Sequence, residues 1–503
     1  MKKLFWVLTL FIGLTITTAY FFLFTATGNG FVVDITETSL NKKSLAEFKI
    51  NEFVLRTDSI NLKVTIDSNS TLEVVGAISI FPMSADLKYN VDIEDLSKLQ
   101  KFTKDKLNGP LKVNGTVKGD KTLMIIEGIS DIFGSNSTYS VRLSDFEPET
   151  IVYLIKGAKI DKLLYTVNQP IYAKGFVDIQ GDITGTKPES LAGKITTKIY
   201  KGIVNTLVVN EKYATKLKQA LNFNGEIITD LKPYQLISNA KIYTSMANVF
   251  ANKAIVNIQD NSISSDYQVD ISDLQKLYDV TQTKMKGSIK LDGTILKNKD
   301  LTVIGTSDIF NGKLDFKLFN DDFTANVNNI KVKSLTDMLY YPEVFNSNAN
   351  AKVTYNLAKS TGVVDANLIN GHFLPNKFSS ILNQFAKFDL TKEVYESVDL
   401  DSKINKNIIK STVRMKSKLT EITIPSSSID TTKRTINAIV ESKIKAIEVG
   451  AVVSGSLDNP QVKVDTSKLL KGAAIQSIKS KIMDKAASGS TKDIVKSLKG
   501  LFN

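Results

Sequence analysis

Few residues of this sequence have types and spacings that could support catalysis. The 503 residues include no cysteine and one histidine, His372. This composition excludes thiol nucleophiles, disulfides and metal sites built from several histidines. A Ser-His-Asp triad would depend on His372 alone, and the flanking Gly371 and Phe373 predict a loop or a strand end.

The other candidate catalytic groups have simpler explanations. Ser39 precedes Lys42 at a Ser-x-x-Lys spacing that arises easily in a lysine-rich chain, and no glycine-rich loop has the context of a phosphate site. Acidic side chains form two clusters beside predicted turns, where aspartate commonly caps helices and hydrogen-bonds to the backbone. The first cluster is Asp92, Glu94 and Asp95, and the second is Asp321 and Asp322. We therefore expect a protein that is not an enzyme and uses no metal or other cofactor.

The excess of positive charge does not point to nucleic acid. The net charge is +12, and residues 461–503 hold nine lysines against three acidic residues. Only four of the 64 cationic residues are arginine, and Phe502 is the one aromatic residue of this basic tail. Nucleic-acid sites favour arginine and stacking aromatic side chains, so we expect no nucleic-acid partner.

The N-terminal residues predict a membrane anchor. Lys2 and Lys3 precede an uncharged run whose most apolar part, Leu4–Phe24, is long enough to cross ~30 Å of hydrocarbon as a helix. Lysines before the helix favour a cytoplasmic N-terminus, so residues 1–28 are expected to be a cytoplasmic stub and a single-pass anchor. A signal peptide cleaved near Ala26 is the alternative, but its apolar region would typically span only about 7–15 residues.

The residues that follow alternate between apolar and polar side chains, as half-buried strands do. Clear examples are residues 62–66, 314–318 and 353–357. The prediction is a mainly β chain of antiparallel strands. Three dipeptides are expected to form hairpin turns: Asn114-Gly115, Asp292-Gly293 and Asn311-Gly312.

An internal repeat is the most informative pattern. The segment VDIEDLSKL at Val91–Leu99 returns as VDISDLQKL at Val269–Leu277, and weaker echoes begin near Ala158 and Ile330. Two further pairs keep an offset of 178 or 177 residues: Gly109–Thr116 with Gly287–Thr294, and Ser130–Phe133 with Ser307–Phe310. Each unit is predicted to be a strand, a short helical turn and a meander of strands, stacked into an elongated array.

Alternation along the strands places apolar side chains on one face of this array. One curled sheet would line a hydrophobic groove suited to acyl chains, whereas two sheets packed together would form tandem sandwiches with ordinary cores. The alternation alone leaves both open, and a one-residue slip would exchange the faces. The candidate lining residues of a groove are Leu111, Val113, Ile289, Leu291, Leu314, Phe316, Val353 and Tyr355.

The anchor, the repeated SDIF segments and the closing segment Val453–Val464 (VSGSLDNPQVKV) resemble the AsmA-like family of Gram-negative envelope proteins, which includes TamB-type members. The resemblance covers essentially the whole chain. It implies a β-groove anchored in the inner membrane that projects into the periplasm. It also implies passive transfer of phospholipid between the inner and outer membranes, as in bridge-like lipid transfer proteins.

The C-terminal residues predict two basic amphipathic helices on either side of Ser488-Gly489-Ser490. Such helices suit an anionic membrane surface or an acidic partner. The resemblance to TamB-type proteins implies that this partner is the outer membrane or one of its barrel proteins. The helices could equally cap the open end of the sheet. The candidate contact residues are Lys471, Lys479, Lys481, Lys485, Lys492, Lys496 and Lys499.

These expectations define one organisation and three functions. The organisation is an anchor over 1–28, a periplasmic β-groove over 29–425, a closing β segment over 426–465 and a helical tail over 466–503. The favoured function is transport of phospholipid in support of outer-membrane biogenesis. The alternatives are an assembly factor for outer-membrane proteins and an adhesin or scaffold of tandem sandwiches.

Overall fold

The computed structural model describes residues 29–465, apart from positions 44, 57, 80–82, 104, 378, 381–382, 384–387 and 446. In this part of the chain, 26 strands form one antiparallel sheet. The predicted mainly β fold is confirmed, and the strands belong to one sheet instead of the two packed sheets of a sandwich. The predicted anchor Leu4–Phe24 and the candidate lysines of the tail lie outside the described residues.

The chain divides into two compact units, Met1–Tyr267 and Gln268–Asn503. Strand β14 (Ile263–Ile271) crosses the boundary. The other elements of unit 1 are α2 (Asn29–Lys43), β1 (Phe48–Leu55), β2 (Ser59–Ile66), β3 (Ser70–Ser79), β4 (Ser84–Ile93), η1 (Leu96–Leu99), α3 (Gln100–Thr103), β5 (Leu111–Asp120), β6 (Met124–Ser130), η2 (Ile132–Gly134), β7 (Asn136–Ser144), β8 (Glu147–Lys159), α4 (Ile160–Thr166), β9 (Ala173–Thr184), β10 (Ala192–Val204), α5 (Thr206–Tyr213), β11 (Asn222–Lys232), β12 (Gln235–Thr244) and β13 (Asn248–Asn257).

Unit 2 continues the same kind of meander. Its elements are η3 (Leu274–Leu277), α6 (Tyr278–Thr281), β15 (Ile289–Lys297), β16 (Leu301–Ile309), β17 (Gly312–Phe319), β18 (Asp322–Lys331), α7 (Val332–Met338), β19 (Phe345–Asn356), β20 (Thr361–Phe373), η4 (Leu390–Lys392), β21 (Tyr395–Asn405), β22 (Ile408–Lys416), β23 (Thr420–Asp430), β24 (Thr435–Ile444), β25 (Ile447–Ser456) and β26 (Gln461–Asp465). The β region therefore begins at Phe48, because residues 29–43 are helical, and β23 runs across the boundary expected between residues 425 and 426.

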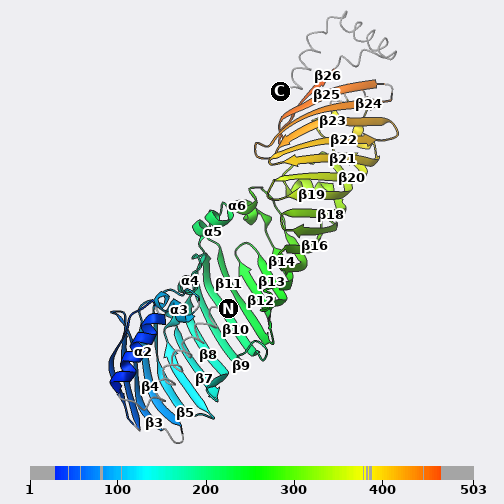
Figure 1. The fold of residues 1–503 in the computed structure, drawn as a ribbon. Coiled ribbons are helices and arrows are strands. Elements are labelled where there is room, and N and C mark those ends of the chain that lie inside the picture. Colours follow the sequence, from blue (N-terminus) through cyan, green and yellow to red (C-terminus); the bar gives the residue numbers. More distant parts are fainter. Residues whose placement is uncertain are drawn as a thin grey trace, which may run out of the picture. The chain divides into compact units, whose positions relative to one another are not determined.

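Helical elements occupy one edge of the sheet in each unit. Every described helix or helical turn after β1 lies between an even-numbered strand and the next odd-numbered one. Consecutive antiparallel strands run in opposite directions, so within a unit all connections from an even-numbered to an odd-numbered strand lie at the same edge of the sheet. Figure 1 shows α3, α4 and α5 along this edge of unit 1. We call it the helical rim, and we call the opposite edge, which carries the turns from odd to even strands, the hairpin rim.

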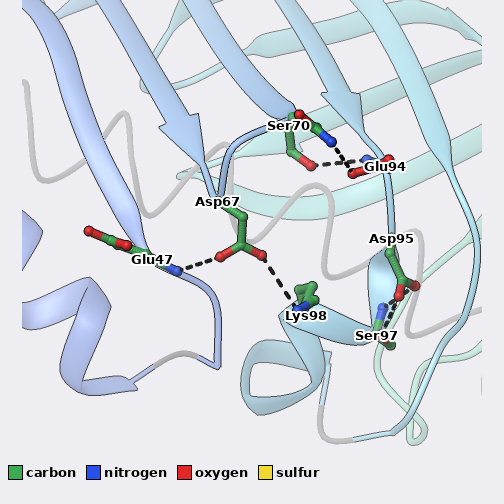
Figure 2. A network of polar contacts seen from close by, with 8 residues as sticks. Glu47, Asp67, Ser70, Glu94, Asp95, Ser97 and Lys98 are labelled. Atoms are coloured by element: carbon green, nitrogen blue, oxygen red, sulfur yellow. Dashed lines mark hydrogen bonds and ion pairs between the residues drawn. The ribbon is translucent and has the colours of Figure 1, made fainter.

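The internal repeat folds the same way twice. In unit 1 the side chain of Asp95 accepts a hydrogen bond from the Ser97 N–H and caps η1, as Figure 2 shows among the neighbouring polar contacts. In unit 2 the side chain of Asp273 accepts a bond from the Gln275 N–H and caps η3 in the same way. The carbonyls of Gly109 and Gly287 then receive the N–H groups of Leu96 and Leu274 at 2.9 and 2.8 Å. The predicted strand and helical turn of each unit are confirmed.

Two of the three predicted hairpin turns are wrong. Asn114-Gly115 lies inside β5 and Asp292-Gly293 lies inside β15, each opposite another glycine of the next strand. Glycine is needed at Gly115 because a Cβ atom there would approach the Glu127 carbonyl oxygen to 1.9 Å and the Tyr89 hydroxyl to 2.6 Å. Asn311 does lie in the tight turn between β16 and β17, with φ of 62°.

Helix α2 protects the first strand of the sheet. Within the described residues β1 pairs only with β2, which leaves its outer backbone groups without a strand partner. Asn41 of α2 accepts from the Phe48 N–H at 2.6 Å and donates to the Phe48 carbonyl at 3.1 Å, and Glu37 accepts from the Ile50 N–H. Residues four apart share one side of a helix, so a single side of α2 satisfies this edge. Uncovered strand edges invite pairing with other chains.

Candidate apolar binding face

One face of unit 2 is apolar from strand to strand. Directly opposed residues of an antiparallel pair point to the same face, so the register traces rows of side chains across the sheet. One row follows the hairpin rim from β15 to β25. We call it the apolar row: Ile295, Val303, Leu318, Phe323, Tyr355, Gly362, Ile404, Ile409, Ile429, Ile436 and Gly455.

The apolar row is neither closed into a core nor fully exposed. Each of its members from Ile295 to Ile436 is half-buried. A second row on the same face is half-buried as well: Leu314, Val327, Ala351, Ala366, Leu400, Val413 and Ile424. On this face of β15–β19 the described residues carry one charge, that of Lys297 at a strand end. This face is therefore a broad hydrophobic surface that is partly accessible to water.

The structure brings the six candidate lining residues of unit 2 together on this face. Leu314 and Phe316 of β17 share it with Val353 and Tyr355 of β19, because the register links both pairs through β18. Ile289 and Leu291 belong to the same alternating set of β15 as Ile295. All six are half-buried, and the Phe316 ring stacks on Phe323 at 5.9 Å between centroids.

The two candidates in unit 1 have a different environment. Leu111 and Val113 of β5 lie opposite Ile93 and Val91 of β4. Their side chains are only 5% and 2% exposed and belong to a large hydrophobic core that spans β1 to β12. The described structure therefore places them in a packed core, whereas the unit 2 candidates are accessible.

Three tyrosines lie in or against the core of unit 1, of which Tyr89 and Tyr153 are buried and Tyr139 is half-buried. Tyr89 and Tyr139 lie over the opposed glycines Gly115 and Gly128, and their hydroxyl groups hydrogen-bond to each other. Tyr153 lies over Gly181 of β9 in the same manner. Burial raises the pKa of Tyr153 to about 12 and also raises the pKa of Tyr139, so these phenols stay neutral at physiological pH.

The opposite face of unit 2 carries the charged side chains of its central strands, together with exposed apolar residues such as Leu296, Ile304 and Val363. Strand β17 presents Lys313, Asp315 and Lys317 there, and Lys313 pairs with Asp315 at 3.5 Å. Strand β19 presents Lys352 and Thr354, both exposed. The charged side chains of β17 and β19 therefore point away from the apolar row, as the alternation of the sequence predicts for a sheet with one face in water.

The candidate catalytic residues do not form a site. His372 is half-buried at the end of β20, opposite Asn346 of β19. Asp95 caps η1 and Asp92 pairs with Lys112 at 2.7 Å. Asp322 accepts a hydrogen bond from Asn356. Ser39 and Lys42 are exposed on α2, and the described residues hold no group of three His, Asp or Glu side chains that could bind a metal ion.

Sequence reasoning missed most of the apolar row, including the four isoleucines of β21–β24. A usable signal exists, because each member of the row from Ile295 to Ile436 lies two or three residues from a short turn. Apolar residues at that distance on both sides of a turn become opposed pairs once the hairpin forms. Without the turn positions, which the Asn-Gly and Asp-Gly signals partly misplaced, the row could not be drawn.

Comparison with known proteins finds no matching family model and no similar curated protein. The resemblance to the AsmA-like family therefore stays a prediction. None of the helices among the described residues has the length and apolar character needed to cross a bilayer.

Proposed function

We propose that this protein is anchored in the inner membrane and carries phospholipid along a groove formed by its apolar face, in support of outer-membrane biogenesis. The observation that supports the proposal best is the apolar row, an uncharged line of side chains across ten strands of unit 2 that remains half-buried. Monomeric soluble proteins rarely leave such a surface uncovered unless it binds something. The resemblance to AsmA-like proteins implies the same cargo and location.

The mechanism would be solvation of acyl chains. Each methylene group transferred from water to the apolar face gains about 0.8 kcal/mol, which is ample for a chain that contacts several strands. The head group would remain at a rim, where polar loops and water can solvate it. Rows that continue from strand to strand would let a lipid move stepwise, because each step exchanges one apolar contact for another.

Site-specific photo-crosslinking in living cells tests the proposal. The full chain would carry benzoylphenylalanine at Phe316 or, as the matched control, at Lys317, which is adjacent in sequence but on the polar face. A second pair compares Tyr355 with Thr354. After labelling with ³²P-phosphate and irradiation, we expect radioactive phospholipid adducts at Phe316 and Tyr355 and not at Lys317 or Thr354.

Two results would contradict the proposal. Equal lipid labelling on both faces would mean that lipid contacts the chain nonspecifically. No lipid adduct at any position, with protein adducts at Phe316 instead, would favour the assembly-factor alternative.

A further inference from the structure

In unit 2, loops from opposite rims of the sheet contact each other. Tyr340 and Tyr341 lie in the connection from β18 to β19, on the helical rim, and Arg434 lies in the turn from β23 to β24, on the hairpin rim. The Arg434 Nη2 donates to the Tyr340 carbonyl at 2.7 Å, and the guanidinium lies 5.4 Å from the centre of the Tyr341 ring. Arg434 also donates to Asp458 of the β25–β26 turn at 2.6 Å. We call these four residues the rim clasp.

Tyr340 is held firmly on its own side of the clasp. Its hydroxyl accepts a hydrogen bond from the Gln275 side chain of η3 at 2.9 Å. The Lys286 ammonium lies 5.2 Å from the centre of its ring and pairs with Asp337 of α7 at 2.6 Å. The clasp therefore connects the hairpin rim to two separate connections of the helical rim.

A second contact joins the two rims independently. The Lys377 ammonium, in the connection from β20 to β21, donates to the Asn459 side chain of the β25–β26 turn at 2.6 Å. Leu390 of the same helical-rim connection is fully buried in a cluster with Val398 and Ile422. Val398 of β21 and Ile422 of β23 point to the same face of the sheet as the apolar row. Leu390 therefore packs on the apolar side of the sheet.

The two rims are distant within the sheet itself. The 12 residues of β19 would extend for roughly 40 Å from rim to rim. Contacts between the rims therefore require connections that reach over a face, and the burial of Leu390 identifies that face as the apolar one. On that face the apolar row stays half-buried at Ile404, Ile409 and Ile429.

We propose that the rim clasp is a lateral gate, which must open for an acyl chain to enter or leave the apolar face beneath it. This inference rests on the proposed function. Its chemistry suits opening, because the Arg434 and Asp458 side chains are 29% and 60% exposed, and exposed ion pairs hold weakly and are screened by salt.

The test combines a lock and a release in the full-length chain. Because the sequence has no cysteine, Lys377→Cys with Asn459→Cys gives a unique pair for a short cleavable bifunctional thiol reagent. Uptake of fluorescent phosphatidylethanolamine from vesicles of phosphatidylethanolamine and phosphatidylglycerol is then followed in four states. These are locked, cleaved, Arg434→Ala and the matched control Lys433→Ala. Crosslinking in denaturant and single-cysteine variants control for proximity.

We expect efficient crosslinking only in the folded chain and uptake at least fivefold slower in the locked than in the cleaved state. Arg434→Ala should accelerate uptake about three- to tenfold and abolish the acceleration that high salt causes in the natural chain, while Lys433→Ala changes neither. Equal uptake in all states, or crosslinking no better than in denaturant, overturns the gate but leaves lipid binding intact. If no variant takes up the probe, the proposed function fails and the gate fails with it, even where the crosslink forms.

Discussion

Replacing Gly115 by alanine tests the register on which the faces of the sheet depend. A Cβ atom at this position would lie 1.9 Å from the Glu127 carbonyl oxygen and 2.8 Å from the Gly128 Cα atom of β6. Backbone atoms cannot rotate away, so β5 and β6 must separate locally. Breaking two or three ladder hydrogen bonds costs about 0.5–1.5 kcal/mol each, and such overpacking typically totals about 1–3 kcal/mol.

The assay is denaturant unfolding followed by circular dichroism, with Asn114→Ala as the matched control. Asn114 is the adjacent residue on the exposed face, so its truncation should change the free energy of unfolding by less than about 0.5 kcal/mol. Adding Tyr89→Phe to Gly115→Ala removes the hydroxyl that the new Cβ would approach to 2.6 Å but leaves the carbonyl in place. The double variant should therefore recover less than half of the loss. A stability of Gly115→Ala equal to that of the natural chain would refute the pairing of Tyr89, Gly115 and Gly128.

Three further predictions concern the edge strand β1, the titration of two buried tyrosines and the hydrophobic cluster around Leu390. Asn41→Ala removes both hydrogen bonds to Phe48 and should cost about 1–3 kcal/mol, with faster hydrogen exchange at Phe48; Ser39→Ala, exposed on the same helix, is the control. Burial raises the pKa of Tyr153 and of Tyr395 to about 12, so the folded chain keeps protons that the unfolded chain releases near pH 10. These groups should leave the free energy of unfolding unchanged below pH 10 and lower it between pH 10 and 12 by up to about 1.4 kcal/mol per pH unit for each tyrosine. Denaturation midpoints measured across this range should fall less steeply in Tyr395→Phe. A flat profile would contradict the burial of the two tyrosines. Leu390→Ala should cost about 2–5 kcal/mol because the side chain is fully buried, and a calorimetric scan that matches the natural chain would contradict its place in the core.

The fold was predictable to the extent that short-range pattern controls it. Alternation identified β2, where Leu62, Val64 and Ile66 are indeed buried between exposed or half-buried neighbours. The repeat identified η1 and η3 together with their strands, because each turn is fixed by one capping aspartate only two residues from its bond partner. Such interactions can be read from sequence since both partners lie within a few residues.

The missed features depend on partners that lie far apart in sequence. Gly115 signals a turn by itself, but Tyr89 and Glu127, which come from other strands, keep it inside β5. Helix α2 carries the polar residues Glu37 and Asn41, whose purpose appears only beside the edge of β1. The contact of Tyr340 with Arg434 spans 94 residues and has no local signature. Six lining candidates share a face because alternation is local, whereas the row that joins them needs the register.

The two halves of the repeat keep the same backbone but differ at the positions that face the apolar side. Tyr139 of unit 1 becomes Phe316 of unit 2 at the offset of 177 residues, opposite the equivalent glycines Gly128 and Gly305. The hydroxyl lost in this exchange is one that hydrogen-bonds to Tyr89 in a packed core. Phe316, which is half-buried like Tyr139, lacks this hydroxyl and stacks on Phe323 on the apolar face. The capping aspartates are thus kept in both units, whereas the hydroxyl of Tyr139 has no counterpart at Phe316, so the two faces differ in chemistry where the backbone is the same.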